Sequence, residues 1–115
     1  MWIVAKVKKK EFEIFKKDII KKAFCDIKFY CPKIEYSQYA NNKFKKLEKF
    51  LLGNYIFCYS PNFNNSIFLN KLRFIKGLEY FLNGNSENQK EIKKFVDYCK
   101  SFENEEGYLT QEFFK

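Results

Sequence analysis

The most apolar stretch of the chain, FLLGNYIFCY at residues 50 to 59, constrains the fold more than any other segment. Its aromatic and β-branched content is typical of a buried strand, and we expect it to be the central strand of a sheet. Side chains of a strand alternate in direction, so Ile56 and Cys58 share one face. If these two point into the core, an aromatic row lies on the opposite face, where it either binds a partner or is covered by loops or the tail. The row comprises Tyr55, Phe57 and Tyr59.

The segments on either side of this strand alternate between strand and helix patterns. Apolar residues recur every second position in a half-buried strand and every three to four positions in an amphipathic helix. These periods predict strands over residues 2–7, 26–36 and 78–82, a helix over residues 9–24, a short helix marked by residues 68–75, and a last helix that contains residues 92–99.

The connection between the second and third predicted strands is unusually polar. Pro32 cannot donate a ladder hydrogen bond, so the strand at 26–36 should end, bulge or lie at a sheet edge there. Residues 37–49 (SQYANNKFKKLEK) are basic and contain a turn candidate at Asn41-Asn42. We therefore expect a hairpin with a long, lysine-rich tip.

Polar residues mark the starts of the later helices. Asn65 or Ser66 is a candidate N-cap for the short helix, because their side-chain oxygens can accept bonds from free backbone N–H groups. A turn is expected at residues 83–85 (NGN), followed by a capping box formed by Ser86 and Gln89.

The resulting order, β-α-β-β-α-β followed by a helix, predicts an α+β fold of the split ferredoxin-like kind, an antiparallel sheet packed with helices. A length of 115 residues fits one domain. We assign it to residues 1–102 and treat residues 103–115 as a tail or truncated linker. No apolar run approaches the roughly 18 residues that span a bilayer, and no signal-peptide pattern is present, so we expect a cytoplasmic protein that does not enter membranes.

The chain contains no histidine. This removes Ser-His and Cys-His nucleophile pairs, imidazole bases and histidine metal ligands. The four cysteines lack the C-x-x-C spacing of zinc knuckles and are expected to be buried free thiols. We therefore expect no enzyme activity, no metal, no cofactor and no small-molecule substrate.

Positive charge is concentrated in the first half of the chain. Residues 1–50 hold 14 lysines against 6 acidic residues, whereas residues 51–115 hold 8 basic against 8 acidic residues. Such asymmetry favours a basic face for nucleic acid or another polyanion. The abundance of Lys, Asn, Phe, Tyr and Ile is also what an AT-rich coding sequence produces, and lysine content alone does not decide between these interpretations.

Several segments together resemble the N-terminal (NGN) domain of NusG-family transcription elongation factors, including the RfaH-like antiterminators. MWIVAKV resembles the opening strand of that family, with Trp2 as its tryptophan. CPKIEY, with Pro32 and Glu35, is similar to its V-P-x-x-E segment, and LLGNYIFCY to its F-P-G/N-Y signature. Lys76-Gly77 before LEYFL is similar to the entry of its last strand. The match covers most of the chain in the family's order.

The resemblance implies an accessory factor that binds RNA polymerase at the clamp helices of the β′ subunit and increases processivity. The positions that match the family's clamp contacts are Leu52, Tyr55 and Phe57. The positions where RfaH-like members face the gate loop of the polymerase β subunit are Asn64, Asn65 and Ser66.

The resemblance also implies contact with the non-template DNA strand. Lys8 and Lys76 match basic positions that face this strand in RfaH-like members, and Lys16 and Lys17 extend the same surface. Gly53 stands where RfaH-like members have proline. The KOW barrel that usually follows the NGN domain does not fit in these 115 residues, so we expect a fragment or a member without that partner function.

Other classes of protein share parts of this pattern. An RNA-recognition-motif-like protein that binds single-stranded RNA has the same βαββαβ order, but its third strand usually reads K/R-G-aromatic-G/A-aromatic, unlike LLGNYIFCY. A small interaction or scaffold protein whose lysines only reflect codon use would bind neither nucleic acid nor polymerase.

Overall fold

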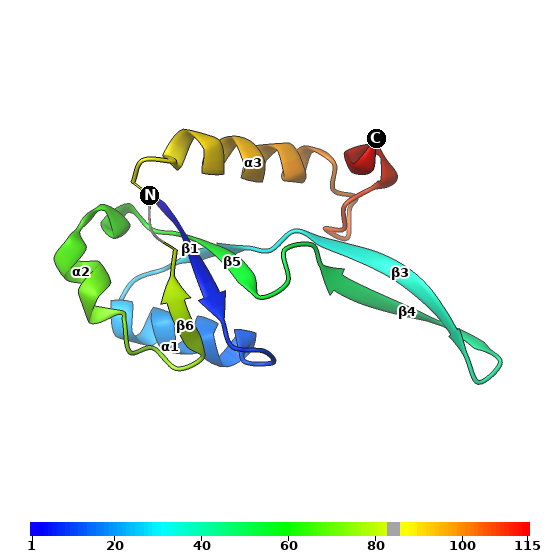
Figure 1. The fold of residues 1–115 in the computed structure, drawn as a ribbon, viewed down its shortest axis with the longest axis horizontal. Coiled ribbons are helices and arrows are strands. Elements are labelled where there is room, and N and C mark those ends of the chain that lie inside the picture. Colours follow the sequence, from blue (N-terminus) through cyan, green and yellow to red (C-terminus); the bar gives the residue numbers. More distant parts are fainter. Residues whose placement is uncertain (83–85) are drawn as a thin grey trace.

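The computed structural model describes residues 1–82 and 86–115. Within these residues four strands form one antiparallel sheet in the order β2-β5-β1-β6 (Figure 1). Their bounds are Trp2–Val7 for β1, Lys28–Tyr30 for β2, Tyr55–Tyr59 for β5 and Leu78–Phe81 for β6. The β5 strand is an inner strand, as its apolar sequence predicts, and the chain has an α+β fold.

Helices cover both faces of this sheet. Helix α1 (Phe12–Ala23) and helix α2 (Ser66–Lys71) contribute to one hydrophobic layer, whereas helix α3 (Gln89–Ser101) crosses the opposite face (Figure 1). The β1 strand is buried on both sides because its residues alternate between the two layers: Ile3, Ala5 and Val7 face α1, and Val4 faces α3. The short segment η1 (Pro61–Asn64) precedes α2.

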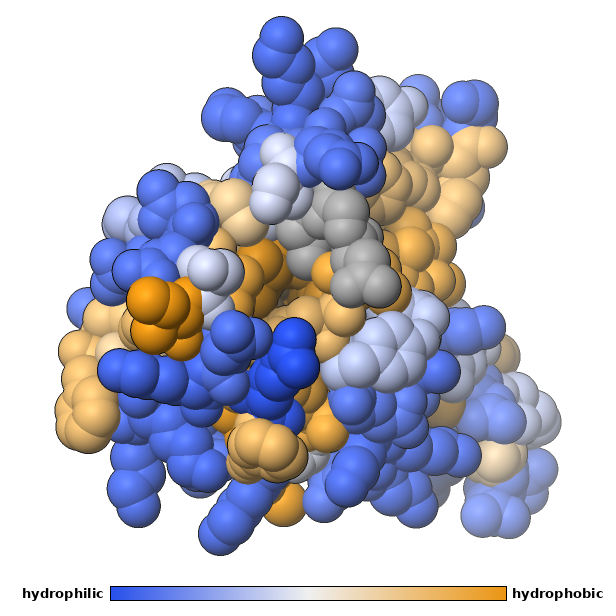
Figure 2. Space-filling model, turned by 60° about the vertical axis from the view of Figure 1, so that its left-hand side comes forward, coloured by the Kyte–Doolittle hydropathy of each residue, from blue (hydrophilic) through white to orange (hydrophobic). Residues whose placement is uncertain are grey.

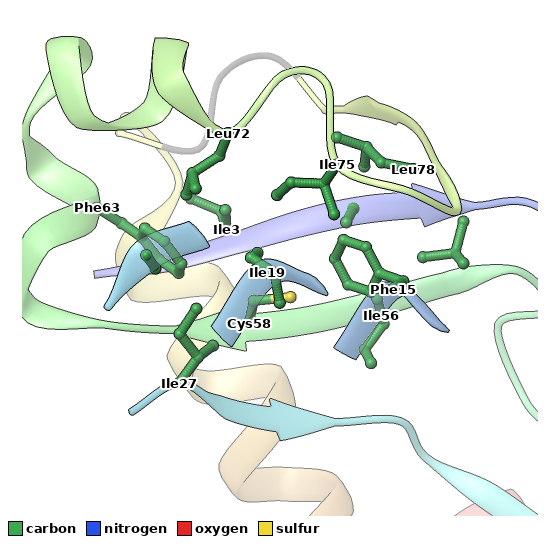
Figure 3. Packing of buried hydrophobic residues seen from close by; sticks show 13 residues of the cluster. Ile3, Phe15, Ile19, Ile27, Ile56, Cys58, Phe63, Leu72, Ile75 and Leu78 are labelled. Atoms are coloured by element: carbon green, nitrogen blue, oxygen red, sulfur yellow. The ribbon is translucent and has the colours of Figure 1, made fainter. Parts of the chain in front are cut away.

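The larger core lies between the sheet and α1 (Figure 3). Phe15 and Ile19 of α1 are fully buried there, against Ile56 and Cys58 of β5. Helical spacing predicts this buried side of α1, although the helix begins at Phe12 and not at Lys9. Further members come from the chain around α2: Phe63, Leu72, Ile75 and Leu78.

A second core lies between the sheet and α3. Phe57 is central to it, together with the α3 residues Val96 and Cys99. The C-terminal segment, which the sequence suggests as a tail, also contributes: Leu109 is buried, and its N–H bonds the carbonyl of Lys33 at 2.9 Å. Residues 103–115 are therefore packed against the rest of the chain.

A partly buried hydrogen bond anchors this segment. The Tyr30 hydroxyl donates to Oε2 of Glu103 at 2.6 Å. Burial, and then the bond to Glu103, raise the pKa of Tyr30, so the phenol stays protonated at neutral pH and keeps donating.

Residues 37–49 contain more strand than the expected long hairpin tip. They belong to a hairpin formed by β3 (Lys33–Ala40) and β4 (Lys43–Phe50), which projects from the sheet (Figure 1). The predicted turn is confirmed: Asn41 and Asn42 both have positive φ, at 53° and 60°. Apolar periodicity could not reveal these strands, because both of their faces meet solvent over most of the hairpin.

The expected strand at residues 50–59 is interrupted. Phe50 ends β4, residues 51–54 form a turn, and only Tyr55–Tyr59 enters the sheet. The interruption predicted at Pro32 is confirmed, since this buried residue separates β2 from β3 and its carbonyl accepts a bond from Leu51 N at 2.8 Å.

The two predicted helix starts have different outcomes. Asn65 is the N-cap of α2, with its Oδ1 accepting from the N–H groups of Ile67 and Phe68 at 2.9 and 3.3 Å. The capping box is wrong, because α3 begins at Gln89 itself. The turn expected at residues 83–85 lies outside the described residues.

The side chain of Gln89 instead forms hydrogen bonds with the backbone of β1. Trp2 N donates to Oε1 of Gln89 at 2.8 Å, and Nε2 of Gln89 donates to Trp2 O at 2.6 Å. The side-chain amide thus takes the place of a neighbouring strand where β6 no longer pairs with β1.

Replacing Gln89 by alanine is expected to lower the free energy of unfolding by about 1–2 kcal/mol, since both backbone groups of Trp2 lose a partner. Urea unfolding measures this, with Lys90→Ala, at the exposed neighbouring position of the same helical turn, as the control. Equal stability of the two variants would show that the amide contacts add nothing.

Candidate functional site

One end of the sheet face that carries α3 presents an aromatic and basic row. Lys6 of β1 lies directly opposite Tyr55 of β5 on one side and Tyr80 of β6 on the other. Tyr80 is 45% exposed, while Lys6 and Tyr55 are half-buried. We call these three residues the open row, because solvent reaches all of them.

Cation–π contacts hold the open row together. The Nζ atom of Lys6 lies 5.9 Å from the ring centroid of Tyr55 and 5.7 Å from that of Tyr80. It also pairs with Oε2 of Glu79 at 3.6 Å. Tyr80 and then Glu79 raise the pKa of Lys6, so the ammonium is charged at neutral pH. Two ring faces around a cation suit contact with a mixed apolar and polar protein surface.

The predicted clamp contacts lie at this end of β5 but differ in exposure. Leu52, in the turn before β5, and Tyr55 are half-buried at the edge of the second core. Phe57 is only 6% exposed, with its ring centroid 5.8 Å from that of Phe95 on α3. The aromatic row was expected either to bind a partner or to be covered by other parts of the chain. Phe57 is covered, and the segment that covers it is mainly helix α3.

Sequence reasoning did not place Lys6 or Tyr80 next to Tyr55. Both belong to predicted strands, and alternation places each on a defined face of its own strand. What was missing is the register between strands, which sets Lys6 beside Tyr55 and Tyr80.

The lysines expected to face DNA do not form a single surface. Lys8 and Lys76 are brought together, since Lys8 N bonds the carbonyl of Gly77 at 2.7 Å, and both side chains are exposed. Lys16 lies elsewhere, 3.6 Å from Oε1 of Glu13 and over the ring of Phe29. Lys17 is exposed on the outer side of α1, away from the buried residues.

An acidic residue supports the junction of Lys8 and Lys76. Asp18 of α1 accepts the backbone N–H of Lys76 at 2.9 Å and pairs with Nζ of Lys22 at 3.3 Å. The backbone bond from Lys76 is the main cause of the lowered pKa of Asp18. The carboxylate therefore offsets part of the positive charge here.

The predicted gate-loop contacts lie beyond the other end of β5. Asn64, Asn65 and Ser66 are all exposed, in η1 and at the start of α2. The amide oxygen of Asn65 is occupied by the helix cap, whereas its neighbours offer polar groups to solvent.

A groove of about 630 Å³ opens between α2 and β6, and Figure 2 shows its hydrophobic floor. Leu69, Phe74 and Phe81 line it, with Arg73, the only arginine of the sequence. The open row borders this groove through Tyr80.

The cysteines are free thiols, two buried and two half-buried. Burial raises the pKa of Cys31 to about 11 and also raises that of Cys58, so both are protonated at neutral pH. Among residues 1–82 and 86–115, no group of three His, Cys, Asp or Glu side chains is placed to hold a metal ion.

No protein-family model matches the sequence, and no curated protein matches it. In the described part of the chain, no helix combines the length and the apolar character needed to cross a membrane.

Proposed function

We propose that this protein is a transcription elongation or antitermination factor that binds RNA polymerase at the β′ clamp helices through Leu52 and the open row. The observation that carries the proposal is the placement of Leu52 and Tyr55. Both match clamp-contact positions of the NusG family and both are half-buried; Tyr55 lies opposite Lys6 in the sheet, and Leu52 lies in the turn that precedes Tyr55. We assign the sheet to the ferredoxin-like NGN type, which the order β2-β5-β1-β6 with α3 on the far face supports.

A bridging mode of action fits the positions of the candidate contacts. Leu52 and Tyr55 lie at the start of β5, and Asn64 to Ser66 follow its end. The five residues of β5 span roughly 15 Å, so a rigid strand separates the two contact regions. Simultaneous contact with the clamp and the β gate loop would hold the clamp closed, while the chemistry stays in the polymerase. Such a factor works in the cytoplasm.

Lys8 and Lys76 are proposed to contact non-template DNA in this complex. They form an exposed pair at one edge of the sheet. Lys16 has weaker support, because Glu13 and Phe29 already engage its ammonium group.

The covered position of Phe57 favours this proposal over binding of single-stranded RNA on the sheet. A base could stack on Phe57 only if α3 moved away, since Phe95 lies against its ring. A protein partner needs only the open row and the adjoining Leu52.

The double variant Leu52→Ala with Tyr55→Ala is expected to weaken retention of core RNA polymerase at least tenfold, because aromatic anchors dominate such interfaces. The test is a pull-down on the immobilised chain, with polymerase that has or lacks the clamp-helix region. Phe24→Ala is the matched control, since it removes an aromatic ring that is 93% exposed at the end of α1, on the opposite face of the sheet.

Clamp-dependent retention that the double variant loses, with native far-UV circular dichroism, supports the proposal. Failure of the unmodified chain to retain polymerase overturns it, and binding of single-stranded RNA that the double variant loses would favour the RNA-binding alternative. Retention unchanged in the double variant would remove Leu52 and the open row from the interface.

A further inference from the structure

The β3–β4 hairpin extends well beyond the sheet and has no role in the proposed polymerase contact (Figure 1). The molecule measures 53 × 29 × 22 Å, and the hairpin lies along the long axis. Its base is anchored, because the Tyr108 hydroxyl donates to Glu48 at 2.9 Å and Nζ of Lys33 lies 3.6 Å from the same carboxylate. Beyond this base, nearly every residue is exposed.

The acidic residues of the hairpin are confined to one of its two faces. Residues directly opposite each other in an antiparallel pair share a face, so the register assigns every side chain of the hairpin to one of its two faces. Both acidic residues, Glu35 and Glu48, lie opposite each other on one face. The other face carries Lys43, Lys45 and Lys49 and no acidic residue.

The lysines of this basic face form no ion pair with any residue that the structure describes. Within residues 1–82 and 86–115, no acidic side chain lies within 4.0 Å of any of the three. Side chains that alternate on a strand repeat about every 6.6–6.8 Å along it. The three ammonium groups thus form a linear row of unneutralised charge, which an extended polyanion matches.

An aromatic ring interrupts this basic row. Tyr36, opposite Leu47, lies between the positions of Lys45 and Lys49 on the same face and is 43% exposed. Cations that follow a backbone, combined with a ring on which a base can stack, are the two elements of single-strand binding surfaces. A simple polyanion would use the lysines only.

We propose that the basic face of the hairpin, Lys43, Lys45 and Lys49 with Tyr36, binds single-stranded nucleic acid, with phosphates on the lysines and a base on the tyrosine ring. The hairpin turn keeps the strands paired, because Asn41 and Asn42 adopt the positive φ that such a turn requires. The surface is therefore preformed. This inference does not rest on the polymerase proposal, because it concerns a different surface and is tested without polymerase.

The chain itself offers matched controls on the opposite face. Lys46 is an exposed lysine there, opposite Ser37. Tyr39 is an exposed tyrosine there, with its ring 5.0 Å from that of Phe44. Each control removes the same chemical group from the same hairpin but from the face that we do not expect to bind.

The experiment measures binding of a fluorescent oligothymidine of about twelve nucleotides by anisotropy over a series of salt concentrations. Reversal of the three lysines to glutamate is expected to reduce the magnitude of the negative slope of log K against log salt by about 2. Each phosphate contact contributes about 0.7 to this magnitude for single strands. Tyr36→Ala is expected to weaken binding about tenfold at fixed salt. Lys46→Glu and Tyr39→Ala should each change binding less than threefold.

Several outcomes would overturn the inference. These are equal effects of the variants on the two faces, equal affinity for a duplex of the same length, or polyphosphate that competes as well as the oligonucleotide. Because the substitutions are at exposed positions, far-UV circular dichroism should stay native. Retention of polymerase by the lysine variants, tested in parallel, separates failure of this inference from failure of the proposed function.

Discussion

Replacing Phe57 by alanine is expected to lower the free energy of unfolding by about 3–5 kcal/mol, the usual cost of removing a buried phenylalanine. The ring packs against three others from three parts of the chain: Phe95 at 5.8 Å and Trp2 and Tyr30 at 6.4 Å each. Its loss leaves a cavity between the sheet and α3. A domain of this size is typically stable by about 5–15 kcal/mol, so the variant should be close to unfolding.

Urea unfolding followed by circular dichroism measures this effect. Phe57→Leu, which keeps most of the volume, should cost clearly less. Tyr55→Ala is the second control, because its half-buried ring lies at the open end of the same strand. If Phe57→Ala were as stable as Tyr55→Ala, the Phe57 ring would not be packed between the sheet and α3.

Replacing Gly77 by alanine is expected to cost at least about 2 kcal/mol, because a left-handed backbone and a close approach coincide there. Gly77 has a φ of +82°, and an added Cβ would lie 2.9 Å from the carbonyl oxygen of Glu11 and 3.2 Å from Cβ of Phe15. The first neighbour is backbone and the second is a fully buried core residue. Relief of the contact would therefore separate α1 from the start of β6.

Gly53→Ala is the matched control for this prediction. Its φ of +65° is also left-handed, but no atom lies within 4 Å of an added Cβ. Only the backbone cost of about 1–2 kcal/mol is expected there. Thermal and urea unfolding of both variants separate the two contributions, and equal losses would mean that the contact with α1 is readily relieved.

The two proposed interfaces occupy different parts of the molecule. The open row lies on the sheet, where β1 pairs with β5 and β6, and the basic face lies on the projecting hairpin. Substitutions in one should leave the other intact, because among the described residues the hydrogen bonds between the hairpin and the body of the chain lie at the hairpin base. The two sets of variants can therefore be combined in one series of binding measurements.

Much of the fold follows from local patterns in the sequence. The strand at Trp2–Val7, the buried side of α1, the Asn41-Asn42 turn and the cap at Asn65 all depend on residues close to one another in the chain. Local steric and hydrogen-bonding preferences are strong enough there to be visible without the rest of the molecule.

Local patterns could not predict the hairpin strands or the partner of Gln89. Strands with two solvated faces show no apolar alternation, so β3 and β4 resemble a polar loop in sequence. Gln89 fits a capping box by spacing, but the backbone of Trp2, 87 residues away, competes for its amide. The backbone groups at the edge of a strand need hydrogen-bond partners, and a side chain that supplies them is not available for a local helix cap.

For the candidate site, the sequence determined which residues of β5 share a face, because alternation is a local property of the strand. Only the tertiary structure decided that α3 covers Phe57, that Tyr55 meets Lys6 and Tyr80, and that Lys8 and Lys76 adjoin while Lys16 lies apart. The exposure of a residue and the clustering of charges depend on which elements pack together. Burial of apolar surface between segments far apart in the chain determines this packing.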